Sequence, residues 1–211
     1  MNKMMGMVAT SEAERASDGF VRGLALGKVT DNEDPKGIGR VRVRLELHNE
    51  DQESFWARVA TPMAGNEMGV YFLPQKDDEV LVGFIGEDPS HPVVLGSVWN
   101  GNAPPPETND GKNDRRLVRT RSGHEMRFDD GDTDEVEVIH NKGARVYLAE
   151  NKAILETDSG NTVTIDGGEI SVTAAQKITL SAPQVIVDAS GKAEVKAGAT
   201  CKIQGAMVEI N

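Results

Sequence analysis

Aromatic residues, cysteine and long apolar runs are scarce in this chain of 211 residues. Its five Phe, two Tyr and two Trp all precede residue 148, so the later part has only aliphatic side chains for a core. The single cysteine, Cys201, excludes a disulfide within the chain, and its position in an apolar row predicts a small buried side chain. No apolar run reaches the length of a membrane span, and the N-terminus lacks the pattern of a signal peptide.

Basic residues are also in deficit, and this limits the partners that the chain can bind. The sequence has 23 Lys and Arg against 34 Asp and Glu, a net charge of −11, and no dense basic block. Binding to the phosphate backbone of a nucleic acid depends on clustered positive charge. We therefore expect no nucleic-acid partner.

What the sequence does contain is a short repeat over its last fifty residues. Apolar or small residues alternate with polar ones, and new blocks begin at residues 170, 178, 185, 193, 201 and 208. A period of two puts apolar side chains on one face of a strand and polar ones on the other, with Ile186 as the clear exception. Seven or eight residues per step leave room for one strand and one turn, so the pattern predicts stacked strands.

A ladder of such strands has one apolar face that must be covered. A single flat ribbon with an open apolar face is marginal in water. Either one chain coils into a solenoid or several copies wind together, and the period leaves both open.

Turn-rich and apolar segments divide the chain into four parts. Residues 1–18 predict an N-terminal arm, 19–100 a small OB-fold barrel, 101–116 a Pro-rich linker and 117–211 the stacked-strand region. The fold class is therefore all-β. In the barrel we expect strands at residues 20–29, 40–47, 55–61, 79–84 and 93–99. After the linker we expect them at residues 117–121, 125–128, 136–139, 145–148, 153–156 and 162–165, ahead of the regular repeat.

Candidate sites for chemistry are weak. Asp130, Asp132 and Asp134 have the spacing that opens a calcium loop, but the sixth and twelfth positions are Glu135 and Asn141 instead of Gly and Glu. Known nucleophile, zinc and phosphate-loop motifs are missing, and His124 stands among charged neighbours at the start of a strand. We therefore predict no catalytic, metal or cofactor-binding residue and no cofactor. We expect Trp56 and Trp99 to pack in or near the barrel.

Three segments together resemble one protein family. They are residues 56–62 (Trp-Ala-Arg-Val-Ala-Thr-Pro), residues 83–100 with Gly86-Glu87-Asp88-Pro89, and residues 121–128 with Ser122-Gly123-His124-Glu125. In this order, with a Pro-rich link before the valine-rich ladder, they resemble spike proteins of contractile injection systems. The relevant members are phage baseplate assembly protein V and the matching parts of VgrG proteins.

This resemblance implies a homotrimer with a triple-stranded β-helix, or β-prism, formed by three intertwined chains. The expected trimer core is Val163, Ile165, Ile170, Val172, Ile178, Leu180, Val185, Val187, Val195, Ile203, Val208 and Ile210. A tip protein of the PAAR type is expected to dock on Met207, Val208, Glu209, Ile210 and Asn211. Other implied partners are a baseplate hub protein, expected as a separate chain, and inner-tube and baseplate proteins.

The implied function is structural and not enzymatic. The protein would cap the inner tube of a phage-tail-like particle and puncture the target envelope, with transient contact with the target membrane. We expect it to be made in the cytoplasm without a signal peptide and then assembled into the particle. The alternatives are a glycan-binding or glycan-cleaving tail enzyme or adhesin, and a monomeric solenoid scaffold.

Overall fold

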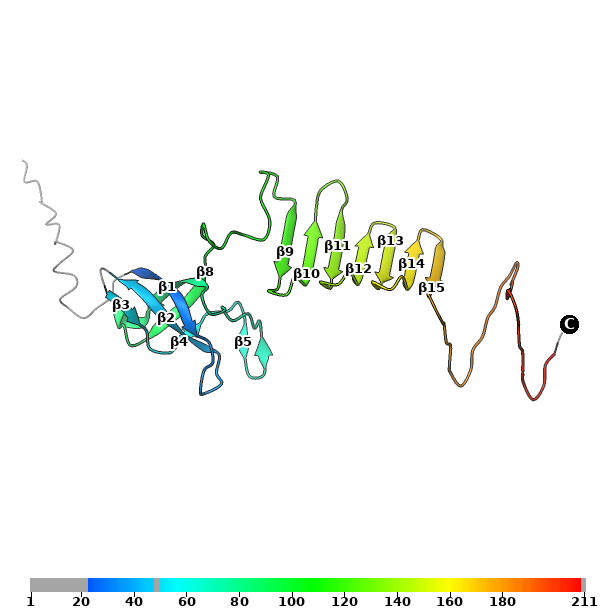
Figure 1. Cartoon of the computed structure of the whole chain (residues 1–211), viewed down its shortest axis with the longest axis horizontal. Helices are drawn as coiled ribbons and strands as arrows, with labels where there is room; N and C mark the ends of the chain where they lie inside the picture. The colour runs from blue at the N-terminus through cyan, green and yellow to red at the C-terminus, as the bar shows by residue number, and fades with distance from the viewer. Residues whose placement is uncertain (1–22, 48–49, 210–211) are drawn as a thin grey trace, which may run out of the picture. The chain divides into compact units, whose positions relative to one another are not determined.

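The computed structural model describes residues 23–47 and 50–209, so the predicted arm at residues 1–18 lies outside the described part. The chain divides into two compact units, Met1–Thr108 and Asn109–Asn211. Both are built from β-strands, and η1 (Ile85–Glu87), a single 3₁₀ turn, is the only helical element among the described residues (Figure 1).

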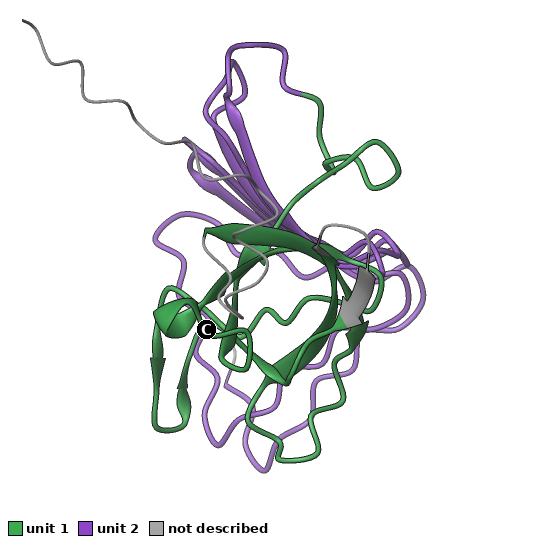
Figure 2. Cartoon of the chain, turned by 90° about the vertical axis from the view of Figure 1, so that its left-hand side faces the viewer, with its two compact units in different colours: residues 1–108 green, residues 109–211 purple. Residues whose placement is uncertain are grey.

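Unit 1 is a closed five-stranded barrel, seen end-on as a ring in Figure 2. The strands are neighbours in the order β1, β7, β8, β4, β2, and pairing between β1 and β2 closes the ring. Pairing is antiparallel except between β4 and β8. The barrel strands are β1 (Leu24–Asp31), β2 (Arg40–Leu47), β4 (Ala57–Val59), β7 (Glu79–Phe84) and β8 (Pro92–Ser97).

Alternation along these strands sends small aliphatic side chains into the barrel. Its largest fully buried side chains are all valines: Val29, Val41, Val43, Val80, Val82 and Val94. A narrow barrel is filled by β-branched residues of this size, which also favour strand backbone. The predicted strands at 40–47 and 79–84 agree with β2 and β7, β4 lies inside the predicted segment 55–61, and β1 and β8 end within two residues of the predicted ends. The sequence pattern missed β3 (Glu50–Glu53), β5 (Ala64–Gly65) and β6 (Met68–Gly69).

One glycine lets β1 and β2 approach closely. A Cβ atom at Gly27 would lie 2.5 Å from Val43 Cγ1 and 2.7 Å from the Arg44 carbonyl oxygen, below any normal contact. The absent side chain is therefore part of the barrel's closure.

Unit 2 contains a seven-stranded antiparallel meander in which every strand pairs with the one before it in sequence. The strands are β9 (Arg115–Arg119), β10 (Glu125–Asp129), β11 (Glu135–Ile139), β12 (Arg145–Ala149), β13 (Lys152–Glu156), β14 (Thr162–Asp166) and β15 (Glu169–Thr173). The first six lie within two residues of the predicted segments, and β15 corresponds to the first block of the repeat.

Three turns on one side of this meander share one geometry. In each, a glycine with φ between +83° and +96° donates its N–H to the carbonyl oxygen three residues earlier. These pairs are Gly123 with Thr120, Gly143 with His140, and Gly160 with Thr157. Positive φ is the conformation that glycine adopts without strain, so these positions fix the hairpin registers.

Residues 174–209 form no paired strand within the chain (Figure 1). The predicted blocks that begin at residues 178, 185, 193, 201 and 208 are therefore without backbone partners in a single copy. A strand needs a neighbour to satisfy its N–H and C=O groups, so a solenoid of one chain is not what this sequence forms here.

Candidate assembly surface

One face of the unit 2 meander is apolar and uncovered. The strand registers align its side chains in two rows, since each apolar residue stands opposite another on the next strand. The first row is Val118, Met126, Val138, Val146, Leu155, Val163 and Val172. The second is Phe128, Val136, Leu148, Ala153, Ile165 and Ile170. Apolar cross-strand rows of this kind are typical of the buried face of a β-sheet.

The residues predicted as a trimer core lie in these rows and in the segment beyond β15. Val163 pairs with Val172, and Ile165 with Ile170, so the structure brings these four together on one face. Ile178, Leu180, Val185, Val187, Val195, Ile203 and Val208 follow on the unpaired segment. All the described members of the set are between 38% and 83% exposed in a single chain. Ile210 lies outside the described residues.

An apolar surface of this extent is unusual for a monomer. Scattered exposed aliphatic side chains are normal, but long contiguous apolar surfaces mark contact sites. Cys201, predicted to be buried, is also exposed in the single chain. The surface defined by the two rows and the apolar residues of the 174–209 segment is called the assembly face below.

The opposite face of the meander carries a ladder of charges. Glu137, only 2% exposed, lies between two arginines. Its carboxylate accepts a hydrogen bond from Arg127 and, at 3.1 Å, from Arg145 Nη1. Arg145 Nε also donates to Glu156 Oε1 at 3.0 Å. Four strands, β10 to β13, are thus tied together by alternating charges across one face.

These contacts shift the pKa values of the two arginines. The hydrogen bond to Glu137 raises the pKa of Arg127. Burial lowers the pKa of Arg145, but its hydrogen bonds to Glu156 and Glu137 outweigh burial and the net shift is upward. Both guanidinium groups therefore stay charged at any pH at which the protein folds.

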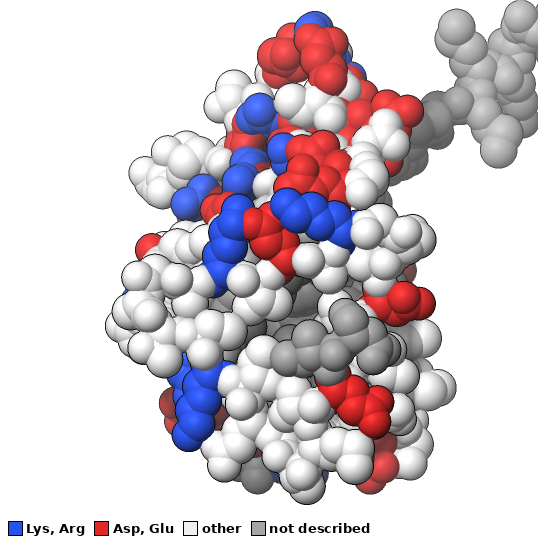
Figure 3. Space-filling view, turned by 90° about the vertical axis from the view of Figure 1, so that its right-hand side faces the viewer, with Lys and Arg blue, Asp and Glu red and all other residues white. Residues whose placement is uncertain are grey.

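Two more cross-strand pairs extend this charged face. Asp129 accepts a hydrogen bond from Gly131 N–H and pairs with Arg115 Nε at 2.9 Å, and together they lower the pKa of its carboxyl group. Lys152 Nζ lies 2.9 Å from Asp166 Oδ2. In the view of Figure 3, Lys and Arg side chains lie next to Asp and Glu side chains. The charges on this face therefore neutralise each other locally.

The sequence pattern did not identify this charge ladder. A signal for it was present in the sequence, because residues of opposite charge stand at equal distances on either side of some of the turns, as Arg127 and Glu137 do around residues 130–134. A test for charge pairing about predicted turns would have found it.

The predicted tip-docking residues are only partly described. Met207 and Val208 are exposed, as is Glu209, whereas Ile210 and Asn211 lie outside the described residues. An exposed apolar pair near the end of the described chain is compatible with a docking surface.

The remaining candidates from the sequence are the Asp130, Asp132 and Asp134 group and His124. Among the described residues, the structure brings no three His, Cys, Asp or Glu side chains together for a metal, and Asp130 pairs with Arg116. The His124 ring lies 4.5 Å from that of His140, where the two turns that carry them meet.

A groove of about 320 Å³ borders the end of the meander, and its lining contains no carboxylate. It therefore offers no acid pair of the kind that glycan cleavage requires.

In unit 1, the two tryptophans differ. Trp56 is half-buried, with the guanidinium carbons of Arg40 and Arg42 at 5.6 Å and 5.2 Å from its ring. Trp99 is 70% exposed, so the prediction that it packs against the barrel is wrong. It stands two residues beyond the end of β8, where the strand alternation no longer directs its side chain inward.

Comparison with known proteins gives a match to one family model and to several curated proteins. Residues 25–99 match the type VI secretion system/phage-baseplate injector OB domain. The chain is 33% identical over 112 residues to the type VI secretion system spike protein VgrG4b of Pseudomonas aeruginosa, covering 48% of this chain and 14% of that protein. It is 30% identical over 129 residues to VgrG1a of the same species, covering 56% of this chain and 20% of that protein.

A third relative is the actin cross-linking toxin VgrG1 of Vibrio cholerae, 25% identical over 137 residues, 61% of this chain and 12% of that protein. The chain thus spans a fifth or less of the length of these relatives. Within the described residues, no helix is long and apolar enough to cross a membrane.

Proposed function

This chain is a VgrG-like baseplate spike protein, and on that premise we propose that it is the structural central spike of a contractile injection system or phage-tail-like baseplate. In this role it caps the inner tube and pierces the target envelope. Its work is mechanical and not catalytic. It acts within an assembled particle, with a transient contact with the target membrane.

The observation that carries this proposal is the assembly face. Unit 1 closes around its own valines, whereas unit 2 leaves its apolar rows exposed and residues 174–209 without a paired strand. Three copies related by a threefold axis would turn the rows of each sheet toward the axis and cover them. The proposed trimer core is therefore the set of residues from Val163 to Ile210 given above, in a β-helix of three chains.

The manner of strand pairing changes along the proposed rod. Through β15, each copy pairs its strands within itself, as a three-sided prism of three sheets would require. From residue 174 onward, backbone partners would come from the other copies. Each added strand contributes hydrogen bonds that must break together when the rod bends, which gives stiffness.

The charged face would then lie outward. Its ion pairs keep the outer surface of the rod hydrated without a strong net charge of one sign. Such a surface would let the rod slide through the tube. The apolar end at Met207 and Val208 would dock a PAAR-type tip protein, and the barrels would contact the hub and inner-tube proteins.

Light scattering on the purified full chain tests the central point. One copy has a mass of 22.7 kDa, and we expect three times that value. A stable, well-folded particle of 22.7 kDa would overturn the proposal.

Tip docking needs its own test. We expect co-purification with a co-expressed PAAR-type tip protein to be lost when residues 207–211 are removed, while the mass of the spike itself is retained. Equal recovery of the tip protein with the shortened chain would contradict the proposed docking site.

A further inference from the structure

The two edge strands of the meander in unit 2 differ in how they are protected. The first, β9, carries Arg115, Arg116 and Arg119, and charged side chains discourage a further strand from pairing with an edge. The last, β15, has Glu169 as its one charged residue. It pairs with β14 on one side, and within the described residues no strand occupies its other side. The edge of β15 is therefore the one that is open to another strand.

The chain that leaves β15 does not turn back onto this open edge. Ala175 N–H donates a hydrogen bond of 3.0 Å to Asn161 Oδ1, in the turn between β13 and β14. The amide group of Asn161 is itself fixed, because Nδ2 donates to Ser159 Oγ at 3.0 Å and to Thr157 Oγ1 at 3.4 Å. The exit from β15 is thus held at the start of β14, away from the free side of β15.

The sequence after β15 lacks the glycine that the three turns on this side of the meander share. Glycines with positive φ form those turns at residues 123, 143 and 160, but no glycine occurs from residue 169 to residue 190. A turn of the same geometry after β15 would put a non-glycine residue at positive φ, which is disfavoured.

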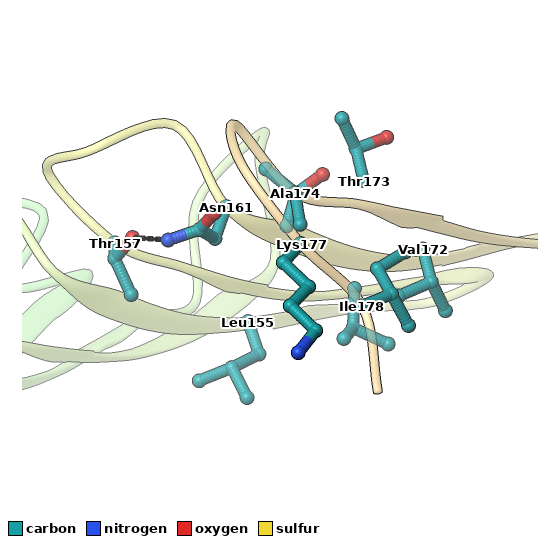
Figure 4. Close-up of a pocket in the computed structure, with 10 residues that line it drawn as sticks. Leu155, Thr157, Asn161, Val172, Thr173, Ala174, Lys177 and Ile178 are labelled. Atoms are coloured by element: carbon teal, nitrogen blue, oxygen red, sulfur yellow. Dashed lines mark hydrogen bonds between the residues drawn. The ribbon is translucent and has the colours of Figure 1, made fainter. Parts of the chain in front are cut away.

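Once held, the chain passes beside the groove at the end of the meander (Figure 4). Leu155, Val163 and Val172 of the first apolar row line this groove, together with Lys177 and Ile178 of the departing segment. In Figure 4 the Lys177 side chain extends toward Leu155, and the Thr157–Asn161 hydrogen bond lies at the turn. The groove is thus a continuation of the assembly face.

We infer that Asn161 is a steering residue, which keeps each chain's own continuation off the edge of β15 so that this edge and the adjoining groove receive an extended segment of a second copy. This inference rests on the proposed function. Each copy supplies both halves of the contact, since β15 has an unfilled edge without arginines and residues 174–209 are an alternating segment without a paired strand among the described residues. A second copy is therefore the occupant that fits.

The experiment compares three variants of the full chain with the wild type by light scattering across a dilution series. Asn161→Ala removes the acceptor for Ala175 N–H, whereas Asn161→Asp keeps an oxygen in that position. Asn141→Ala is the matched control, because Asn141 Nδ2 donates to Ser122 O in a turn of the same unit, remote in sequence from Ala175. The melting temperature of the barrel in each variant checks that unit 1 remains folded.

We expect Asn161→Ala to weaken assembly about fivefold per copy, the usual effect of one hydrogen bond, and so about a hundredfold for three copies. Asn161→Asp and Asn141→Ala should assemble like the wild type.

Assembly of Asn161→Ala equal to that of Asn141→Ala would overturn the steering role while leaving the trimer intact. Equal losses in Asn161→Ala and Asn161→Asp would also overturn it, because the acceptor oxygen would then be irrelevant. If the wild-type protein had the mass of a single copy, both this inference and the proposed function would be refuted.

Discussion

The two units of this chain bury opposite kinds of side chain. In unit 1 the buried core consists of valines, one leucine and alanines, enclosed by a barrel that one copy completes. Among the described residues of unit 2, the buried side chains are Asp129 and Glu137, while its aliphatic rows are exposed. Apolar burial drives folding, so a sheet with buried charges and exposed valines needs a further surface to cover its apolar face. The comparison teaches that one chain can contain a domain that buries its own core and a second domain whose apolar face only further copies of the chain can cover.

The sharpest way to break this comparison is to place a charge on the assembly face. Val172 and Ser171 are neighbours on β15 with side chains on opposite faces. Val172→Asp would bring three carboxylates into the proposed core, each costing several kcal/mol to bury, so we expect assembly to be abolished. The measurement is the mass by light scattering, with the barrel melt as a check on unit 1.

Ser171→Asp is the matched control, since it adds the same charge one residue away on the polar face. We expect this variant to assemble normally. Loss of assembly in both variants to the same degree would show that charge in β15, and not the apolar face, is what matters.

A truncation inside the barrel should behave in the opposite way. Val82 is fully buried in unit 1, and Val82→Ala should destabilise it by about 2 kcal/mol through lost burial and an unfilled cavity. That corresponds to a fall in the melting temperature of unit 1 on the order of 10 °C, the same at every protein concentration. Val163→Ala, in the assembly face, should leave this melt unchanged and instead weaken association. A concentration-dependent barrel melt in Val82→Ala would contradict the independence of the two units.

The sequence predicted the strands of both units well because the period of two is a local property. Residues 40–47 and 79–84 alternate clearly, and the structure has strands at those positions. The short β5–β6 hairpin was missed because two residues per strand are too few to show a period. The steering contact of Asn161 with Ala175 was also invisible, since it joins residues fourteen positions apart through one side chain. Trp99 was misplaced because side-chain direction is set by alternation only within a strand.

Removing the buried charge of unit 2 should have a smaller effect than emptying the barrel core. Glu137→Gln leaves Arg127 and Arg145 facing each other without their shared carboxylate. Both guanidinium groups are partly exposed, so we expect a loss of about 1–2 kcal/mol, below that of a fully buried pair. Thermal denaturation of the assembled protein measures it. Ser171→Thr, a neutral change on the same face, is the control, and equal stability of Glu137→Gln and wild type would show that the ladder contributes nothing.

The smallest expected effect is a pH dependence confined to unit 1. Asp34 accepts hydrogen bonds from Arg40 and from three backbone N–H groups, and Arg40 above all holds the pKa of this carboxyl far below its usual range. A carboxyl with a depressed pKa stabilises the fold above its ordinary value, about 3.9, and this contribution is lost as the pH falls toward the folded-state pKa. Asp34→Asn should therefore lower the barrel melting temperature at pH 7.

Below about pH 4, that difference between wild type and Asp34→Asn should narrow, because the wild type then loses the same contribution. Asp77→Asn is the control, since it removes one carboxylate from an exposed pair with Lys28. Asp34→Asn should not change the assembly of unit 2 at any pH, because Asp34 belongs to the barrel. A difference between wild type and Asp34→Asn that stays constant from pH 7 to pH 3 would mean that Asp34 acts through shape alone and not through its charge.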